Sequence, residues 1–225
     1  MTLSKLTGLL LILLPIAFNV VFILLQRNFE YPDILRKPTD YILRRFNEGG
    51  TPLIATWYAF AFTGVLFIPV AILVHQTLAS EDTPYMAVAT TIGVLAGLVQ
   101  FLGLIRWPFL VPYLAKTYFE PDATQATRDS IAVVFQAFHR YAGVAIGEHL
   151  GFLFTSIWSV FIALAITQSP LFNAWLGWIG LLPAIGIFIG IFEEAGFKAA
   201  AAINAISYIL WSLWLIIVGI VLLLN

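Results

Sequence analysis

The sequence contains no cysteine and very little charge. The absence of cysteine from 225 residues excludes disulfides, thiol catalysis, iron–sulfur clusters and cysteine-ligated zinc. Charged residues make up only 10% of the chain, against about 25% in a typical soluble domain. A chain with so few charges cannot cover a water-facing surface with polar groups. We therefore expect the lipid bilayer to be its partner, surrounding most of the chain.

The sequence also lacks a basic domain and a set of metal ligands. The net charge is −1, which argues against nucleic acid as a partner. His75 is expected at the outer face and His149 near the inner face, while His139 lies about 15 Å from His149 along one helix. Because zinc needs three or four converging ligands, we expect no metal site and no cofactor.

Long apolar runs are what the sequence does contain. Six are long enough to cross a hydrocarbon core of about 30 Å. They lie near residues 6–26, 53–78, 85–106, 143–167, 171–192 and 200–224. The predicted fold class is all-α, a polytopic membrane helical bundle of about six transmembrane helices in a single integral membrane domain spanning 1–225. The first run is about 20 residues long and is followed by Arg27, so we interpret it as a retained span rather than a signal peptide.

The basic residues lie almost entirely on one side of this predicted topology. Loops 27–52, 107–142 and 193–199, with the span ends beside them, carry all the lysines and arginines except Lys5. Positively charged loops stay in the cytoplasm, so both termini are predicted to be non-cytoplasmic. The predicted location is the bacterial plasma (inner) membrane.

The two long loops are predicted to contain helices. The cytoplasmic loop 27–52 is amphipathic, with apolar residues at helical spacing and arginines on the remaining arc, which is typical of a helix lying in the membrane interface. In the cytoplasmic loop 107–142, a proline-rich interfacial segment precedes a helix predicted to open with a capping box at Asp122. That helix continues to residue 167, too long for any bilayer, so we expect it to project or to bend near Gly143.

One ladder of small residues predicts close helix packing. Gly143, Gly147, Gly151, Thr155 and Ser159 follow one another at four-residue steps. Small residues let helix backbones approach closely, which strengthens van der Waals contact inside a bilayer. The same type of surface also serves association with a partner helix or with a second copy of the chain.

A few polar residues fall at membrane depth and are the candidate ligand-binding residues. They are Gln100, Arg106, Arg140, Glu148 and His149. A carboxylate at the depth expected for Glu148 costs several kcal/mol unless it is paired, hydrated or protonated. Two interpretations stay open. Either Arg106 (or Arg140) pairs with Glu148 structurally, or Glu148 binds a proton or ligand in a cavity facing the cytoplasm, with His149 as its hydrogen-bonding neighbour.

Two stretches carry a resemblance to a known family. The first is LIRWPFLVPYLAKTY followed by TRDSIAVVFQAFHRYAGVAIGEHLGFLFTSIW, and the second is FEEAGFKAAAAINAISYILWSLWLIIVGIVLL. Together they resemble bacterial proteins grouped as domain of unknown function 4386. The resemblance implies a multi-pass membrane protein and no particular activity. It draws attention to Trp107 and Pro108 in addition to Arg106, Arg140, Gly147, Glu148 and His149.

Three hypotheses for function follow from these residues. The preferred one is binding or translocation of a small solute or proton through a small polar cavity near the cytoplasmic side. The alternative is a structural or accessory membrane subunit that docks a partner protein. The third is an intramembrane enzyme acting on a lipid, with Glu148 and His149 as acid and base. The motifs of the common hydrolases and nucleotide-binding enzymes do not occur, so the sequence favours a protein that is not an enzyme.

Overall fold

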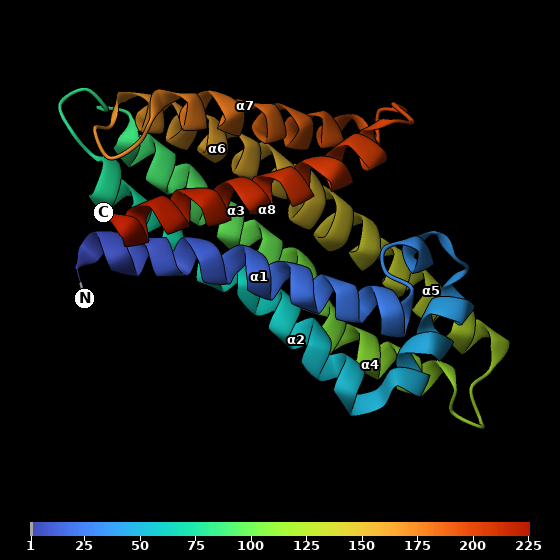
Figure 1. Cartoon of the computed structure of the whole chain (residues 1–225). Coiled ribbons are helices and arrows are strands. Elements are labelled where there is room, and N and C mark those ends of the chain that lie inside the picture. Colours follow the sequence, from blue (N-terminus) through green and yellow to red (C-terminus); the bar gives the residue numbers. More distant parts are fainter. Residues whose placement is uncertain (1) are drawn as a thin grey trace.

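The computed structural model describes residues 2–225, and all regular structure in that range is helical. Figure 1 shows the arrangement of these helices, with both termini at one end of the molecule. The α-helices are α1 (Leu3–Phe29), α2 (Thr39–Leu78), α3 (Met86–Leu104), α4 (Arg106–Tyr118), α5 (Gln125–Phe138), α6 (Gly151–Gln168), α7 (Ala174–Ile189) and α8 (Ala200–Leu224). Two short 3-10 helices, η1 (Asp33–Arg36) and η3 (Gly190–Phe192), and a π-helix, η2 (His139–Leu150), complete the chain.

Six helical segments are long and apolar enough to cross a membrane, which confirms the predicted fold class. In two of them consecutive helices run together. Helices α3 and α4 form one segment, Met86–Tyr118, and α5, η2 and α6 form another, Gln125–Gln168. The proline-rich stretch after Ile105 is therefore a helical continuation of the third span.

The six spans close into a ring. Helix α1 packs against α2, α2 against α3, α3 against α6, α6 against α7, α7 against α8, and α8 returns to α1 (Figure 1). Glycines permit the tightest of these contacts. A Cβ atom on Gly8 would lie 2.7 Å from the carbonyl oxygen of Gly219, and one on Gly64 would lie 2.8 Å from that of Gly97. Such distances leave no room for a side chain, so these backbones are in direct contact.

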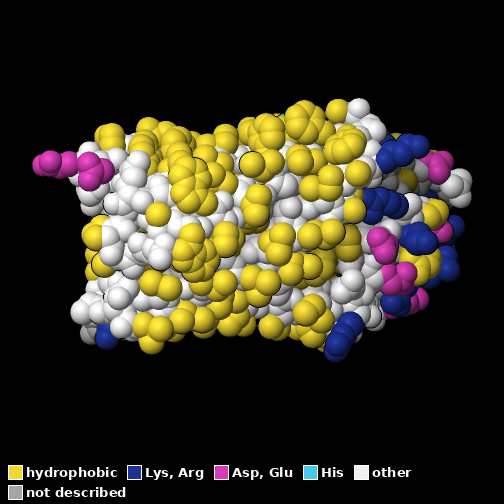
Figure 2. Space-filling model, turned by 45° about the horizontal axis from the view of Figure 1, so that its top comes forward, with side chains coloured by type: hydrophobic (Ala, Val, Ile, Leu, Met, Phe, Trp, Pro, Cys, Tyr) yellow, Lys and Arg dark blue, Asp and Glu magenta, His cyan; other side chains and the backbone are white. Residues whose placement is uncertain are grey.

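The surface of the ring is apolar along most of its length, and the charges gather at one end. Figure 2 shows a broad apolar belt, with most lysine, arginine and acidic side chains at the end opposite the termini. Trp175 and Trp178 are exposed at the start of α7, while Tyr113 and Tyr141 are exposed near the charged end. Aromatic residues at the two boundaries of an apolar belt are typical of a protein that crosses a bilayer.

The segment between the first two spans folds as a helix joined to the second span. Residues 39–49 form the first part of α2, and the helix breaks at Gly50, whose φ of 53° is unfavourable for residues with a Cβ atom. Pro52 follows in the first turn of the membrane-crossing part. The amphipathic helix is thus joined to the second span through the break at Gly50, and its apolar side chains Ile42 and Phe46 are buried.

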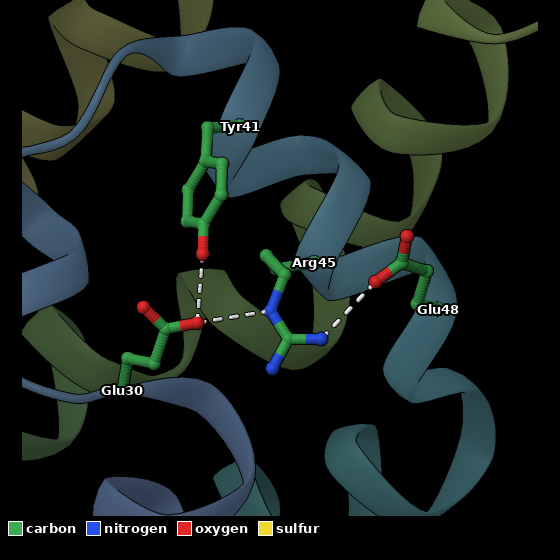
Figure 3. A network of polar contacts seen from close by, with 4 residues as sticks. All are labelled: Glu30, Tyr41, Arg45 and Glu48. Carbon is green, nitrogen blue, oxygen red and sulfur yellow. Dashed lines mark hydrogen bonds and ion pairs between the residues drawn. The ribbon is translucent and has the colours of Figure 1, made fainter.

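A polar network fixes this helix to the end of α1. Glu30 caps α1 in the left-handed conformation and accepts hydrogen bonds from the Tyr41 hydroxyl at 2.8 Å and from Arg45 Nε at 3.1 Å. Arg45 also forms an ion pair with Glu48 at 3.1 Å (Figure 3). The hydrogen bond from Tyr41, followed by that from Arg45, lowers the pKa of the Glu30 carboxyl.

Acidification is expected to loosen this attachment. A carboxylate whose pKa is lower in the folded state than in the unfolded state stabilises the fold at any pH above its unfolded-state pKa of about 4.3. This stabilisation is lost as the pH falls through the folded-state pKa. The hydrogen-exchange protection factors of residues 39–49, which are corrected for the pH dependence of the chemical exchange rate, should therefore fall below about pH 4 in the wild type. In Glu30→Gln these protection factors should be lower already at pH 7 and should change less with pH. An equal pH slope in both proteins would assign the acid sensitivity to another group.

The helix after residue 121 begins slightly later than the sequence predicts. Its first residue is Gln125, and its cap is Thr124, whose hydroxyl accepts a hydrogen bond from the Thr127 amide at 3.2 Å. The capping box predicted at Asp122 is therefore wrong. Gln125 instead donates to Asp129 one turn along the same helix, at 2.8 Å. A threonine satisfies the free amides of a first turn as an aspartate would, so the error moves the helix start by only a few residues.

Candidate functional site

The candidate site is built around the π-helix His139–Leu150. This segment contains Arg140, Gly143, Gly147, Glu148 and His149, which are most of the residues singled out in the sequence. π-Helices are rare, and they occur often at functional sites. The sequence predicts only a bend near Gly143 here. The structure keeps the helix continuous and widens its turns, which changes the face on which each of these side chains lies.

Arg106 is buried against this π-helix. Its side chain is 9% exposed and donates a hydrogen bond to the carbonyl of Gly103, and its guanidinium packs directly on Gly143. The guanidinium also lies 3.4 Å from Nδ1 of His139 and 5.2 Å from the centre of the Trp107 ring. The absent side chain of Gly143 therefore provides the space that the guanidinium occupies.

The small-residue ladder packs against three helices, α3, α4 and α8. A Cβ atom on Gly147 would lie 2.9 Å from Cα of Gly103, and one on Gly151 would lie 3.1 Å from the Gln100 side chain. Gln100 Nε2 donates to the hydroxyl of Thr155 at 2.9 Å. The structure therefore places the first four members of the ladder against α3 and α4. Ser159 turns towards α8, where it accepts a hydrogen bond from Trp211 Nε1 at 2.7 Å.

Glu148 lies in a small recess at the charged end of the ring. We call it the Glu148 recess; it is lined by Val144, Glu148, His149, Phe152, Gly190, Ile191, Glu193 and Glu194. The recess is partly open to solvent, and its cavity volume is about 10 Å³. A cavity of that size holds about one water. The recess brings Glu148 and His149 together with the α7–α8 connection.

The predicted pairing of Glu148 with arginine is not present. No ion pair within 4.0 Å joins Glu148 to Arg106 or to Arg140. Arg106 is turned towards Gly143 and His139, whereas Arg140 is exposed. His149 is exposed as well and makes no hydrogen bond to Glu148. The π-helix contributes to this difference, because its i→i+5 hydrogen bonding puts more residues in each turn and so places side chains on other faces than α-helical spacing predicts.

Tyr31 is a member of this region that the sequence reasoning missed. It lies in the connection after α1 and packs its ring 5.3 Å from that of Trp57 and 6.0 Å from that of Phe60. Burial raises the pKa of the Tyr31 phenol, and the negative charge of Glu148 raises it further, while the positive charge of Arg106 opposes the rise. Both charges therefore act on one phenol. Nothing in the sequence of this connection indicates that the Tyr31 side chain packs beside the site.

The same end of the ring is bridged by an ion pair between two connections. Arg36, in the α1–α2 connection, lies 2.9 Å from a carboxylate oxygen of Glu193, at the end of the α7 segment. Both side chains are substantially exposed, so the pair is worth at most about 1 kcal/mol. Of the glutamates lining the Glu148 recess, Glu193 is therefore already neutralised by a cation, whereas Glu148 and Glu194 have no ion-pair partner within 4.0 Å among residues 2–225.

The titratable residues do not form a metal site. Across residues 2–225, no three histidine, aspartate or glutamate side chains are grouped so as to hold a metal ion. His75 binds the hydroxyl of Thr90 at 2.7 Å near the terminal end of the ring, far along the chain from His139 and His149. The titratable side chains that line the recess are Glu148, His149, Glu193 and Glu194.

Comparison with known protein families agrees with this architecture. The family model described as Domain of unknown function (DUF4386) matches residues 6–219. The chain belongs to the DUF4386 family. The match extends from the first turns of α1 into α8 and so includes all six spans of the ring, and it confirms the resemblance drawn from the sequence. No curated protein and no solved structure matches the chain.

The residues matched by the DUF4386 family model include every residue of the candidate site. Gln100, Arg106, the π-helix and the Glu148 recess all lie within the matched residues. This DUF4386 protein is thus a multi-pass membrane protein whose buried arginine and recessed carboxylate lie within the matched region.

Proposed function

We propose that this protein binds or translocates a proton or a small solute through the polar end of the helix ring. We place it in the bacterial plasma membrane, with both termini outside the cytoplasm. The charge distribution supports this orientation, because the end of the ring opposite the termini carries nearly all the lysines and arginines (Figure 2). The Glu148 recess would then open towards the cytoplasmic side.

The observation that carries the proposal is the environment of Glu148. It is a carboxylate on a π-helix, in a segment long and apolar enough to span a membrane, beside a water-sized recess, and no described cation lies within 4.0 Å of it. A purely structural carboxylate at this depth would be expected to pair with a cation, because an unpaired charge costs several kcal/mol. A group that must take up and release a proton is instead left unpaired and close to water.

The neighbouring residues support distinct roles. Arg106 supplies a fixed positive charge whose position is set by Gly103 and Gly143, and it would limit the entry of other cations. Gln100, bonded to Thr155, carries polar groups deeper into the ring. His149 is exposed at the edge of the recess, and Arg140 is exposed on the same π-helix, where both would meet water or lipid headgroups.

The size of the recess bears on the other two hypotheses. An enzyme acting on a lipid would need a pocket of lipid dimensions beside Glu148 and His149, whereas the recess admits about one water. Docking of a partner protein makes no use of an unpaired carboxylate inside the bundle. Proton binding is the activity that both the chemistry and the dimensions of the site favour.

Proton flux into proteoliposomes tests the proposal. Under an imposed potential, wild-type protein should acidify the lumen faster than protein-free vesicles, as followed with an enclosed pH dye. Glu148→Gln keeps the shape of the side chain and removes its titration, and it should slow the flux by about tenfold or more. Glu120→Gln, an exposed change in the α4–α5 connection, is the matched control.

Two outcomes would contradict this proposal. Full flux in Glu148→Gln would remove this carboxylate from the mechanism. The absence of flux in the wild type, for protons and for a panel of small solutes, would leave the accessory-subunit hypothesis in its place. Purification in mild detergent would then be expected to recover a stoichiometric partner.

A further inference from the structure

Two segments of the chain form the walls of the Glu148 recess. One wall is the π-helix together with the first turn of α6. The other is the connection between α7 and α8, residues 190–199, which contributes Gly190, Ile191, Glu193 and Glu194. The width of the recess is therefore set by the position of this connection relative to the π-helix. A displacement of the connection alone would change the access to Glu148.

The two ends of the connection are fixed to the bundle. Gly190 packs directly on the side chain of Asn204 in α8, where a Cβ atom would overlap the amide group. Asn204 in turn donates a hydrogen bond to the carbonyl of Ile187 at 3.1 Å. At the other end, Ala200 is completely buried. Movement of the connection is therefore limited to the residues between Gly190 and Ala200.

Between these ends the connection is bonded mainly to itself. Residues 194–199 are all exposed. The backbone hydrogen bonds are local, with the Gly196 amide donating to the Glu193 carbonyl at 3.0 Å and the Phe197 amide to the Phe192 carbonyl at 3.1 Å. Apart from its own chain neighbours, no described atom lies within 4 Å of the position that a Cβ atom on Gly196 would take. Buried contacts therefore do not hold this stretch in place.

One ion pair ties the connection to the rest of the protein. Within residues 2–225, the side chains of the connection make a single hydrogen-bonded contact, in which Arg36 donates to Glu193 at 2.9 Å. Arg36 itself is firmly placed, because it belongs to η1, whose Ile34 is completely buried in the apolar cluster at the charged end. The pair thus joins a loosely held wall of the recess to a fixed part of the bundle.

We propose that residues 191–199 form a strap beside the Glu148 recess, which the Arg36–Glu193 ion pair holds closed and which opens when the pair separates. The inference rests on the proposed function and adds how the carboxylate gains access to the cytoplasmic side. In this structure the pair is formed, and the recess admits about one water. When the pair breaks, the strap moves away from the π-helix and the recess widens.

An exposed ion pair suits a strap that opens and closes repeatedly. Both side chains are substantially exposed, so the pair contributes little free energy and is screened by salt. Its loss should change the ratio of open to closed strap by about fivefold at most, the factor that corresponds to about 1 kcal/mol. This limit sets the size of the effect that an experiment should find.

A single thiol in the recess reports the position of the strap without any measurement of transport. The protein contains no cysteine, so Val144→Cys places one thiol on the π-helix wall. The whole protein in detergent micelles is treated with an uncharged maleimide, and the rate of modification is followed by mass spectrometry. In this background, Arg36→Gln and Glu193→Gln should each raise the rate by about twofold to fivefold.

The two substitutions also separate opening of the strap from a charge effect on the thiol. Arg36→Gln makes the surroundings more negative, which raises a thiol pKa and slows modification, whereas Glu193→Gln acts in the opposite direction. Only opening of the strap raises the rate in both. The exchange Arg36→Glu with Glu193→Arg restores a pair and should return the rate towards that of Val144→Cys alone. Arg44→Gln, which removes another exposed pair, with Asp40, is the matched control.

Salt provides a second measurement that needs no further substitution. Raising the ionic strength from about 0.05 M to about 1 M weakens an exposed pair, so it should increase the rate of modification in Val144→Cys. In the Arg36→Gln background the pair is already absent, and the rate should not respond to salt.

The results separate the strap from the proposed function. Unchanged rates in Arg36→Gln and Glu193→Gln, rates that move in opposite directions, or a rise equal to that in Arg44→Gln would each overturn the strap, even if Glu148→Gln slows proton flux. A rate that stays raised in the charge exchange would show that this pair does not close the recess. If the strap variants behave as expected and Glu148→Gln leaves flux unchanged, the strap stands and the role of Glu148 falls.

Discussion

Trp107→Ala is expected to lower the free energy of unfolding by about 3–5 kcal/mol, the range for removing a fully buried large aromatic side chain. Trp107 is 1% exposed and stacks on Trp57 with ring centres 4.4 Å apart and planes 10° apart. Its ring also contacts Phe29 of α1 and Phe135 of α5. One side chain therefore joins four helices at the charged end of the bundle, and its removal leaves a cavity that none of them can fill alone.

The measurement is reversible unfolding in mixed detergent micelles, with the wild type as reference. Trp178→Ala is the matched control, because Trp178 is 59% exposed on the lipid-facing surface. It should shift the midpoint much less than Trp107→Ala. A similar loss for both tryptophans would mean that the stacked cluster contributes no more than lipid contact does. Arg106 rests beside the Trp107 ring, so the variant is also expected to disturb the guanidinium.

Gly103→Ala is expected to destabilise the protein by about 1–3 kcal/mol, the usual cost of inserting atoms into a filled core, and Gly103→Leu is expected not to fold. A Cβ atom on Gly103 would overlap Cα of Gly147 and would lie 3.0 Å from the carbonyl oxygen of Ala142. Both contacts are backbone atoms of the π-helix, which cannot rotate away as a side chain can. The two helices must then move apart.

Ala145→Leu is the control for this prediction. Ala145 lies on the same π-helix but is exposed, so added volume there points away from α3. Thermal unfolding in detergent should show a clear loss for Gly103→Ala and little change for Ala145→Leu. If proton flux is established, Gly103→Ala should also reduce it, because the displaced π-helix carries Glu148. A fully stable Gly103→Ala protein would show that the crossing has room to spare.

The sequence predicts the fold well because partition into lipid depends on local composition. Each of the six apolar runs is long enough to span a bilayer without contact with the others, and the charge bias is likewise a property of separate loops. The amphipathic segment 27–52 is predicted for the same reason, since helical spacing of its apolar residues is local. The errors at this level are small: the cap of α5 is Thr124, two residues after the predicted Asp122.

The candidate site is predicted less well, because it depends on which side chains face one another. Glu148 and Arg106 are both identified from the sequence as costly polar groups at membrane depth, and both lie at the charged end of the ring. Their pairing is not formed, since the guanidinium occupies the space left by Gly143 and the carboxylate opens into the recess. The rotation of a helix about its axis decides such contacts, and apolar periodicity does not fix it where the helix widens to π geometry.

The sequence by itself determined that this protein has six helices long and apolar enough to span a membrane and that nearly all of its lysines and arginines lie on one side of them. Each of these properties follows from the types of residue in a segment and from the length of that segment. The free energy of placing a segment in lipid is nearly a sum over its residues. Only the tertiary structure decided that the spans close into a ring, that Arg106 and Glu148 lie apart, and that Phe67, Trp158 and Trp211 pack together in its core. Those contacts join residues far apart in the chain, and they arise from packing between helices, which no single segment specifies.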